Sequence, residues 1–183
     1  MQEISDKQLI GQTLAGNMRA YGQLVARHQD RVFRFLMGML RNRSTAEDLT
    51  QDAFVKAARH LGTLKNHASF GAWVLSIARN LALDWLRSAP PAWRELEQTN
   101  IQGAGTAASE TRLLVRRALS EMTQQDKEIL LLVDLLGLSI QELTEHFSLS
   151  PSATKMRISR ARKRFRRLFQ QLSAGEDQEG KNV

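Results

Sequence analysis

Apolar residues recur at helical spacing in two separate blocks of this chain. The first block covers residues 1 to about 87, and the pattern resumes near residue 111. Between the blocks, Pro90 and Pro91 interrupt the pattern, and a stretch rich in Gly, Ala, Ser, Thr and Gln follows. Such a stretch cannot bury much apolar surface. Since strand patterns are absent, we expect an all-α protein with two small helical domains joined by a flexible linker.

The expected boundaries follow from these shifts in composition. The ranges are 1–88 for the first domain, 89–111 for the linker, 112–174 for the second domain and 175–183 for a polar tail. The first domain should hold four helices, covering about 4–14, 19–40, 44–60 and 69–87. A capping box of Ser44 with Glu47 would begin the third helix. In the fourth, the core face would be the one that carries Phe70, Trp73, Ile77 and Leu81.

The second domain ends in a short amphipathic helix, a turn and a long basic helix. In SIQELTEHFSLSPSATKMRISRARKRF, the first helix has Ile140, Leu143 and Phe147 on one face. Ser150 can cap the next helix, in which Pro151 takes the favoured first position. No acidic residue interrupts that helix before Phe169. Two helices joined in this way, with cations on the second, are typical of a helix-turn-helix that enters the major groove of DNA.

Side chains in the first half of the basic helix are the candidates for reading DNA. Base edges usually meet this part of a recognition helix, whereas a dense cluster of arginines further along would mostly meet phosphates. Arg and Lys can read guanine, and a methionine offers only an apolar contact. The alternative is a solvated basic face on an ordinary helix hairpin. The candidate set is Lys155, Met156, Arg157, Ser159, Arg160 and Arg162.

Composition favours a polyanionic partner and gives no sign of an enzyme. The net charge is +7 and the pI is near 10.4, and binding to phosphates releases counterions. The chain has no cysteine, and its four histidines are scattered without ligand spacing. Glycine-rich phosphate loops and a GxSxG motif are also absent from the sequence. We therefore expect no catalytic, metal, cofactor or small-molecule site, and the lack of a long apolar run or signal peptide predicts a cytoplasmic protein.

An acidic ridge lies on the third expected helix. Asp48, Gln51 and Asp52 have the spacing of one helix side. In a basic chain such a ridge suits a cationic protein surface better than DNA. The alternative is that these acids favour the first turns of a helix through its dipole. The residues alone leave both interpretations open.

The fourth expected helix carries polar and cationic residues beside aromatic ones. Arg79, Asn80, Asp84 and Arg87 lie away from its apolar face. Amides and cations beside aromatic rings can hold unstacked bases. An ordinary solvated helix face is the simpler explanation of the residues by themselves.

Three segments, in this order, resemble an RNA polymerase sigma factor of the extracytoplasmic-function group in the sigma-70 family. AYGQLVARHQDRVFRFLMGMLRNRSTAEDLTQDAF and ASFGAWVLSIARNLALDWLR are similar to the two parts of that family's promoter-melting domain. The helix-turn-helix segment is similar to its second DNA-binding domain, with the Arg-Ala-Arg ending at residues 160–162. Met156 departs from the family pattern, which has a small polar residue there.

The resemblance implies a role for each candidate set. Asp48, Gln51 and Asp52 would dock on a coiled coil of the polymerase's largest subunit, while the second-largest subunit completes the core enzyme. Arg79, Asn80, Asp84 and Arg87 would contact the opened −10 element, where the segment 61–69 cradles a flipped base. The basic helix would read the −35 element, and the linker would thread through the polymerase. An anti-sigma factor, in this family often membrane-bound, is a further implied partner.

Two rival functions remain at this point. A stand-alone helix-turn-helix regulator would bind duplex DNA alone at a two-fold-symmetric site, whereas a sigma factor needs core polymerase and an asymmetric promoter. An enzyme that acts on nucleic acid would need sets of acidic metal ligands, and the acids here cluster on one helix instead.

Overall fold

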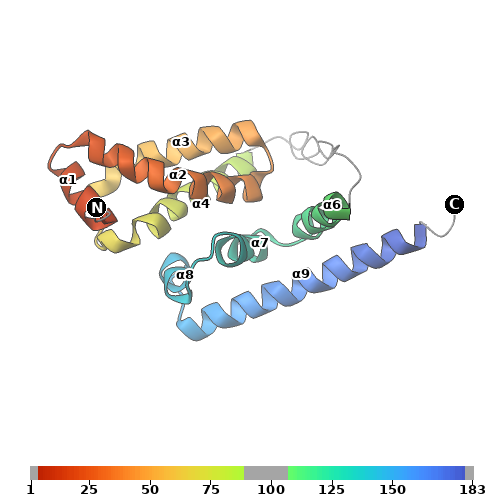
Figure 1. Ribbon diagram of the computed structural model, residues 1–183. Helices are drawn as coiled ribbons and strands as arrows, with labels where there is room; N and C mark the ends of the chain where they lie inside the picture. The colour runs from red at the N-terminus through yellow and green to blue at the C-terminus, as the bar shows by residue number, and fades with distance from the viewer. Residues whose placement is uncertain (1–3, 89–106, 180–183) are drawn as a thin grey trace. The chain divides into compact units, whose positions relative to one another are not determined.

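The computed structural model describes residues 4–88 and 107–179, and every regular element in these ranges is helical. The chain divides into two compact units, Met1–Ala89 and Pro90–Val183 (Figure 1). The all-α fold with two helical domains is confirmed. Most of the expected linker, residues 89–106, lies outside the described residues.

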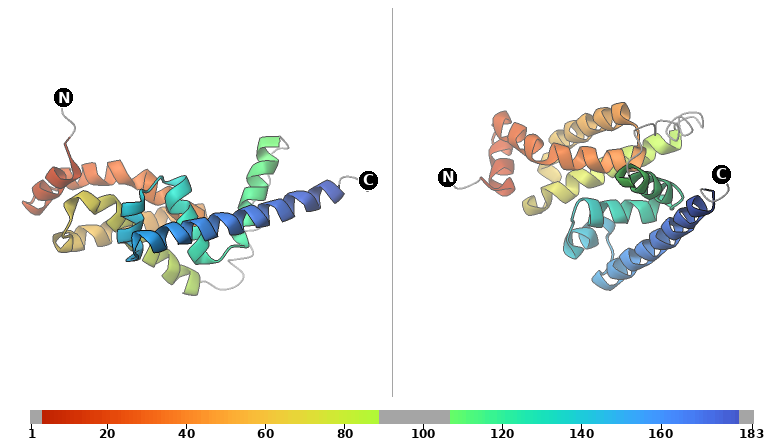
Figure 2. Two further views of the ribbon diagram at one scale, coloured as in Figure 1. Left: turned by 90° about the horizontal axis from the view of Figure 1, so that it is seen from below. Right: turned by 45° about the vertical axis from the view of Figure 1, so that its right-hand side comes forward.

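Within residues 4–88, the first unit has four helices and two short 3-10 turns. α2, α3 and α4 pack against one another, and α1 packs on α2 and on the two turns (Figures 1 and 2). The elements are α1 Asp6–Leu14, α2 Met18–Leu40, α3 Arg43–His60, η1 Leu61–Thr63, η2 His67–Ser69 and α4 Phe70–Ser88.

The start of α3 differs from the expected capping box. Arg41 ends α2 in a left-handed conformation, with φ of 59°, and Asn42 then caps α3 by accepting a hydrogen bond from the backbone N–H of Thr45 at 3.0 Å. The helix therefore begins at Arg43, before the predicted cap at Ser44. Glu47 forms an ion pair with Arg43 instead, at 2.8 Å.

The core face of α4 also differs from the expectation. Phe70 is fully buried as expected, but Trp73, Ile77 and Leu81 are only half-buried. Small side chains on the neighbouring face let α4 approach the other helices closely, so that face becomes the core side. Its buried members are Gly71, Ala72, Val74, Leu75, Ala78 and Ala82.

A buried tyrosine joins two helices of this unit. Tyr21 of α2 donates a hydrogen bond from its hydroxyl to the backbone carbonyl of Phe54 in α3. Burial raises the pKa of Tyr21 to about 12, and a backbone hydrogen bond with Ala58 offsets part of this effect.

The second unit holds the helix-turn-helix. Its elements are α6 Ala107–Ser120, α7 Gln124–Leu130, the π-helical turn η3 Leu131–Leu135, α8 Ile140–Phe147 and α9 Pro151–Glu179. α9 packs on α6, α7 and α8. The core between these helices includes Leu114, Ala118, Ile129, Leu132, Leu143, Ile158 and Ala161.

Local signals set the limits of the two helices in this motif. Ser139 and Glu142 form a capping box at the start of α8, and Ser148 ends it in a left-handed conformation, with φ of 52°. Ser150 then accepts a hydrogen bond from the backbone N–H of Ala153 at 3.2 Å, with Pro151 at the first helical position. The predicted turn and cap are confirmed.

Both ends of this unit are more helical than expected. α6 begins at Ala107, before the expected domain boundary at residue 112, and α9 continues to Glu179. The segment 175–183, expected as a polar tail, is therefore helical over its first five residues. Residues 180–183 lie outside the described ranges.

Candidate nucleic-acid and protein interfaces

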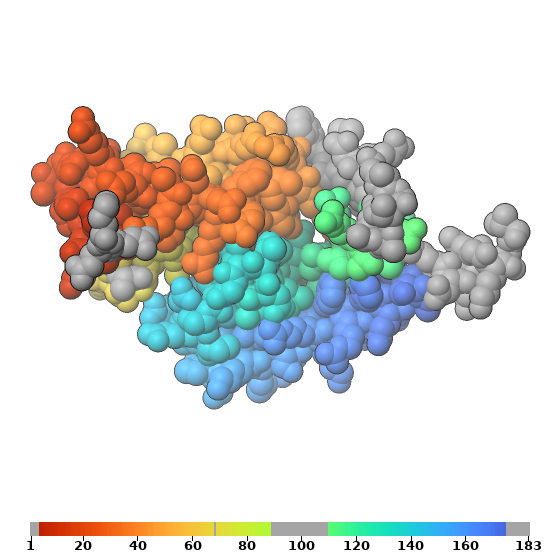
Figure 3. All heavy atoms as spheres, viewed as in Figure 1, coloured from red at the N-terminus to blue at the C-terminus, as the bar shows by residue number. Residues whose placement is uncertain are grey.

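α9 has one buried and one open face. Thr154, Ile158 and Ala161 face the core and are at most 5% exposed. Lys155, Met156, Ser159 and Arg160, all predicted to read DNA, are exposed on the opposite side. Figure 3 shows side chains of α9, in blue, at the surface of the second unit. Four of the six predicted DNA-reading residues therefore share one accessible face.

The other two predicted DNA contacts are engaged within the domain. The guanidinium of Arg157 lies 4.4 Å from the centre of the Phe147 ring, a cation–π contact across the turn. Arg162 donates two hydrogen bonds to Asp134, and this carboxylate raises the pKa of Arg162 above its ordinary value. These contacts hold both arginines at the flanks of the open face, next to the core.

A groove runs beside the open face of α9, with a volume of about 490 Å³. Its apolar lining comes from Val133, Ile140 and Ile158, which belong to three different elements. Its polar lining comes from α9 alone and consists of Lys155, Ser159, Arg162, Lys163 and Arg166. The positive potential of the open face therefore extends toward the start of α8.

A buried polar pair, which the sequence did not indicate, supports the helix-turn-helix. His146 of α8 lies 3.1 Å from Glu128 of α7, and the two side chains are 0% and 1% exposed. Thr144 and Thr154 meet across the two helices, with their hydroxyl oxygens 3.2 Å apart. His146 and Glu128 are 18 positions apart in the sequence, and Thr144 and Thr154 are 10 apart, so no local pattern reveals either pair. Among the residues that the structure describes, no group of three or more potential ligands is placed to hold a metal ion.

The acidic ridge lies on the exposed side of α3. Asp48, Gln51 and Asp52 are all exposed, and Val55, 48% exposed, continues the same helix side. The opposite side, with Ala53 and Phe54, is buried. In α3, which is described throughout, no acid occupies the first turn. The helix-dipole interpretation therefore does not account for Asp48 and Asp52, because that effect fades beyond the first turn.

The polar residues of α4 form a second exposed strip in the first unit. Asn80, Asp84 and Arg87 are exposed and follow one another at spacings of four and three. Arg87 forms an ion pair with Asp84. Arg79 is half-buried and donates a hydrogen bond to the side-chain oxygen of Asn80 at 3.3 Å. The structure thus brings three of these four predicted residues together on one side.

The segment before α4, residues 61–69, presents polar side chains on apolar supports. Leu61 and Leu64 are buried. The exposed residues are Thr63, which lies between these two leucines, and Lys65 and Asn66, which follow Leu64. The side chain of Asn66 donates a hydrogen bond to the hydroxyl of Ser69 at 2.7 Å, which closes the turn before α4.

Comparison with known proteins assigns the two units to a family. The family model for sigma-70 region 2 matches residues 24–90, and that for sigma-70 region 4 matches residues 112–165. The chain is 32% identical, over 176 residues, to the ECF RNA polymerase sigma factor SigM of Mycobacterium tuberculosis. The aligned segment covers 94% of this chain and 89% of SigM. The chain belongs to the extracytoplasmic-function group of the sigma-70 family.

Two solved structures share the fold of this sigma factor. One is a structure of CnrH in complex with the cytosolic domain of CnrY, with a TM-score of 0.71 and 28% identity. The superposed region covers 90% of this sigma factor and 97% of CnrH. The sigma factor RpoE of Bartonella quintana, in complex with the anti-sigma factor NepR, shares the fold with a TM-score of 0.63 at 21% identity, over 82% of this chain and 96% of that one.

The candidate sites of this sigma factor fall within the matched regions. The ridge on α3, the segment 61–69 and the strip on α4 belong to region 2, and the open face of α9 belongs to region 4. No helix within the described ranges 4–88 and 107–179 is long and apolar enough to cross a membrane.

Proposed function

We propose that this sigma factor binds core RNA polymerase through α3, holds the opened −10 element along α4 and reads the −35 element with α9. The observation that carries the proposal is the open face of α9, on which Lys155, Ser159 and Arg160 are exposed in a chain of this family. Arg and Lys there can bond guanine in the major groove, and Ser can bond several bases.

The two exposed strips of the first unit support the remaining parts of this function. The ridge of Asp48, Gln51 and Asp52 is accessible and suits a basic protein surface, such as a coiled coil of the largest polymerase subunit. Asn80 on α4 and the segment 61–69 offer amide and hydroxyl groups to an unpaired base. One chain recognises both DNA elements. Binding of one domain to its element therefore raises the effective concentration of the other domain near the second element.

Such a protein directs another enzyme and catalyses no reaction itself. Its place of action would be the cytoplasm, where the polymerase and promoter DNA are. No cofactor or small-molecule substrate enters this scheme. Opening the DNA costs a few kcal/mol per unstacked base, which base capture must offset.

The test is transcription of fragmented genomic DNA by core polymerase, with and without this protein, followed by sequencing of RNA 5′ ends. We expect protein-dependent start sites that share two upstream elements. Arg160→Ala should weaken promoter binding by about 1–3 kcal/mol and so reduce transcription from these starts. Its competition for core polymerase should be unchanged. Arg34→Ala, an exposed arginine on α2, is the matched control. No new starts, combined with binding of duplex DNA without polymerase at a symmetric site, would favour a stand-alone regulator.

We also propose an anti-sigma factor as regulator, because CnrH and RpoE were both solved with a protein partner. When it is isolated from its native cells, the sigma factor should elute in a stoichiometric complex with this partner and without polymerase. Removal of that partner should raise transcription from the mapped starts. Free sigma factor in uninduced cells would contradict this part of the proposal.

A further inference from the structure

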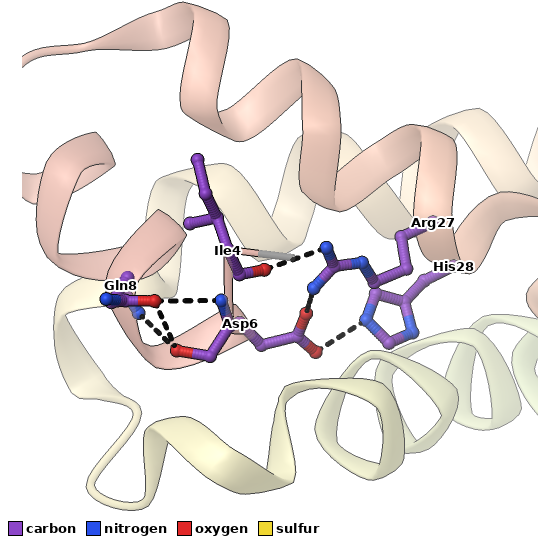
Figure 4. A network of polar contacts seen from close by, with 6 residues as sticks. Ile4, Asp6, Gln8, Arg27 and His28 are labelled. Carbon is purple, nitrogen blue, oxygen red and sulfur yellow. Dashed lines mark hydrogen bonds and ion pairs between the residues drawn. The ribbon is translucent and has the colours of Figure 1, made fainter. Parts of the chain in front are cut away.

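His28 of α2 contacts two other helices of the first unit at once. Its Nε2 lies 2.7 Å from Oδ2 of Asp6 in α1, and the side chains are 12% and 18% exposed (Figure 4). Its ring meets the ring of Phe70 in α4 edge-on, with 5.3 Å between the centroids. One side chain therefore joins α1, α2 and the first residue of α4.

Gly71 makes the approach of α4 to this ring possible. A Cβ at residue 71 would lie 3.1 Å from both Cε1 and Nδ1 of His28. That separation is shorter than ordinary van der Waals contact between such atoms. Any other residue at this position would therefore require the imidazole or the start of α4 to move by a few tenths of an ångström.

Arg27 holds the other side of the same carboxylate. Its Nη1 donates a hydrogen bond to Oδ1 of Asp6 at 2.5 Å, and its Nη2 donates one to the backbone carbonyl of Ile4 at 2.9 Å (Figure 4). Ser5 and Gln8 form a capping box around the first turn of α1. α1 has nine residues, and a helix of this length is marginal in water unless it is docked. The contacts of Asp6 are thus a main polar attachment of α1 to α2.

α1 in turn supports the segment 61–69. It packs against both η1 and η2, and Cδ2 of Leu14 lies 4.0 Å from the position that a Cβ on Gly62 would take. The exposed polar side chains of this segment lie next to the buried Leu61 and Leu64 and precede the start of α4. Its position therefore depends on α1 on one side and on Phe70 and Gly71 on the other.

We propose that the contact between His28 and Asp6 is a positioning device for the segment 61–69. By fixing α1 and the start of α4 against α2, it holds Thr63, Lys65 and Asn66 where they can receive an unpaired base of the −10 element. His28 and Asp6 touch no DNA in this scheme and act through the segment. The inference rests on the proposed promoter function and adds two residues that its DNA contacts do not include.

The experiment measures discrimination by holoenzyme between two single-stranded oligonucleotides. One carries the non-template −10 sequence of a mapped promoter, and the other carries the same bases in scrambled order. The readout is the ratio of the two Kd values. Both oligonucleotides bind the same folded fraction, so partial unfolding alone leaves this ratio unchanged.

Asp6→Ala should lower this ratio roughly tenfold, because a shift of the capturing segment by about 1 Å is enough to lose oriented contacts. Its competition for core polymerase, which uses α3, should stay within about twofold of the wild type. Asp30→Ala is the matched control, since it also removes an aspartate that pairs with an arginine on α2, Arg34, at 2.8 Å. It should keep the wild-type ratio.

Two further variants separate positioning from folding. Asp6→Asn keeps an acceptor oxygen near His28 and should retain most of the discrimination that Asp6→Ala loses. Gly71→Ala disturbs the same contact from α4 by a few tenths of an ångström and should lower the ratio by a smaller factor than Asp6→Ala does. Wild-type discrimination in both Asp6→Ala and Gly71→Ala would overturn the inference and leave the promoter function intact. Absence of discrimination in the wild-type holoenzyme would overturn both.

Discussion

Arg162 and Asp134 are joined by two hydrogen bonds, from Nε to Oδ2 at 3.3 Å and from Nη2 to Oδ1 at 2.5 Å. The pair fixes α9 to η3 beside the face that we propose reads the −35 element. Both side chains are about half exposed, at 53% and 46%, so solvent screens the pair and its contribution to stability is small. We expect its larger effect to be on DNA binding, because an arginine bound to a carboxylate is not free to bind a phosphate.

Asp134→Asn should therefore strengthen non-specific DNA binding. Release of Arg162 adds about one phosphate contact, so the plot of log K against log salt should become steeper by roughly one unit. Discrimination between promoter and random DNA should fall, because the added contact carries no sequence information. Salt titrations of the isolated protein with random DNA measure the first effect, and titrations of the holoenzyme with promoter and random DNA measure the second. Glu121→Gln removes the same charge at an exposed position just after α6 and should leave the slope unchanged.

Met156 should contact the methyl group of a thymine in the −35 element. Its side chain is 54% exposed on a face otherwise made of cations and hydroxyls, and an apolar side chain can read only the methyl group among the base edges of the major groove. Replacement of the contacted thymine by deoxyuracil should cost about 0.8 kcal/mol, or roughly fourfold in Kd. In Met156→Ala the same replacement should have little effect. Equal sensitivity of both proteins to every thymine-to-uracil change would refute the contact.

Reversal of charge on the acidic ridge should weaken binding of core polymerase. Asp48→Lys together with Asp52→Lys places two cations opposite a basic surface, and like charges at an interface cost several kcal/mol. Competition with wild-type protein for core polymerase measures the loss. Asp30→Lys, an exposed aspartate on α2, is the control for charge alone. If the double variant competes as well as this control, α3 is not the docking surface.

Tyr21 should make the first unit sensitive to alkaline pH. Its folded-state pKa of about 12 lies above the ordinary value of 10.0, so the folded state favours the neutral phenol. This contribution to stability is fully present below pH 10 and is lost as the pH rises from 10 toward 12. Tyr21 is the single tyrosine of the chain, so absorbance of phenolate near 295 nm reports on it alone. We expect ionisation well above pH 10, together with loss of helical signal. A midpoint near 10 in the folded protein would contradict the burial argument.

Tyr21→Phe tests the same argument from the other side. The variant has no phenol to ionise, so its unfolding free energy should vary less between pH 10 and 12. At neutral pH it loses the hydrogen bond to the carbonyl of Phe54 and should be less stable by about 1 kcal/mol.

Several features could be predicted from local sequence because local contacts produce them. The turn between α8 and α9 follows from Ser150 and Pro151, whose capping chemistry acts within a few residues. Helix periodicity likewise separates the two domains and places Asp48 and Asp52 on one side of α3. The predicted cap of α3 was wrong by two residues because Asn42 and Ser44 both suit a cap, and the left-handed Arg41 decides between them.

By itself, then, the sequence determined the helical class, the two domains, the helix-turn-helix and the cationic face of its second helix, since each depends on residues within about one turn of one another. Only the tertiary structure decided which side of α4 is buried, because that depends on how closely its alanines let neighbouring helices pack. It also decided which arginines of α9 stay free. Asp134 and Arg162 are 28 positions apart, as Asp6 and His28 are 22 apart, and such pairs meet only when whole helices dock.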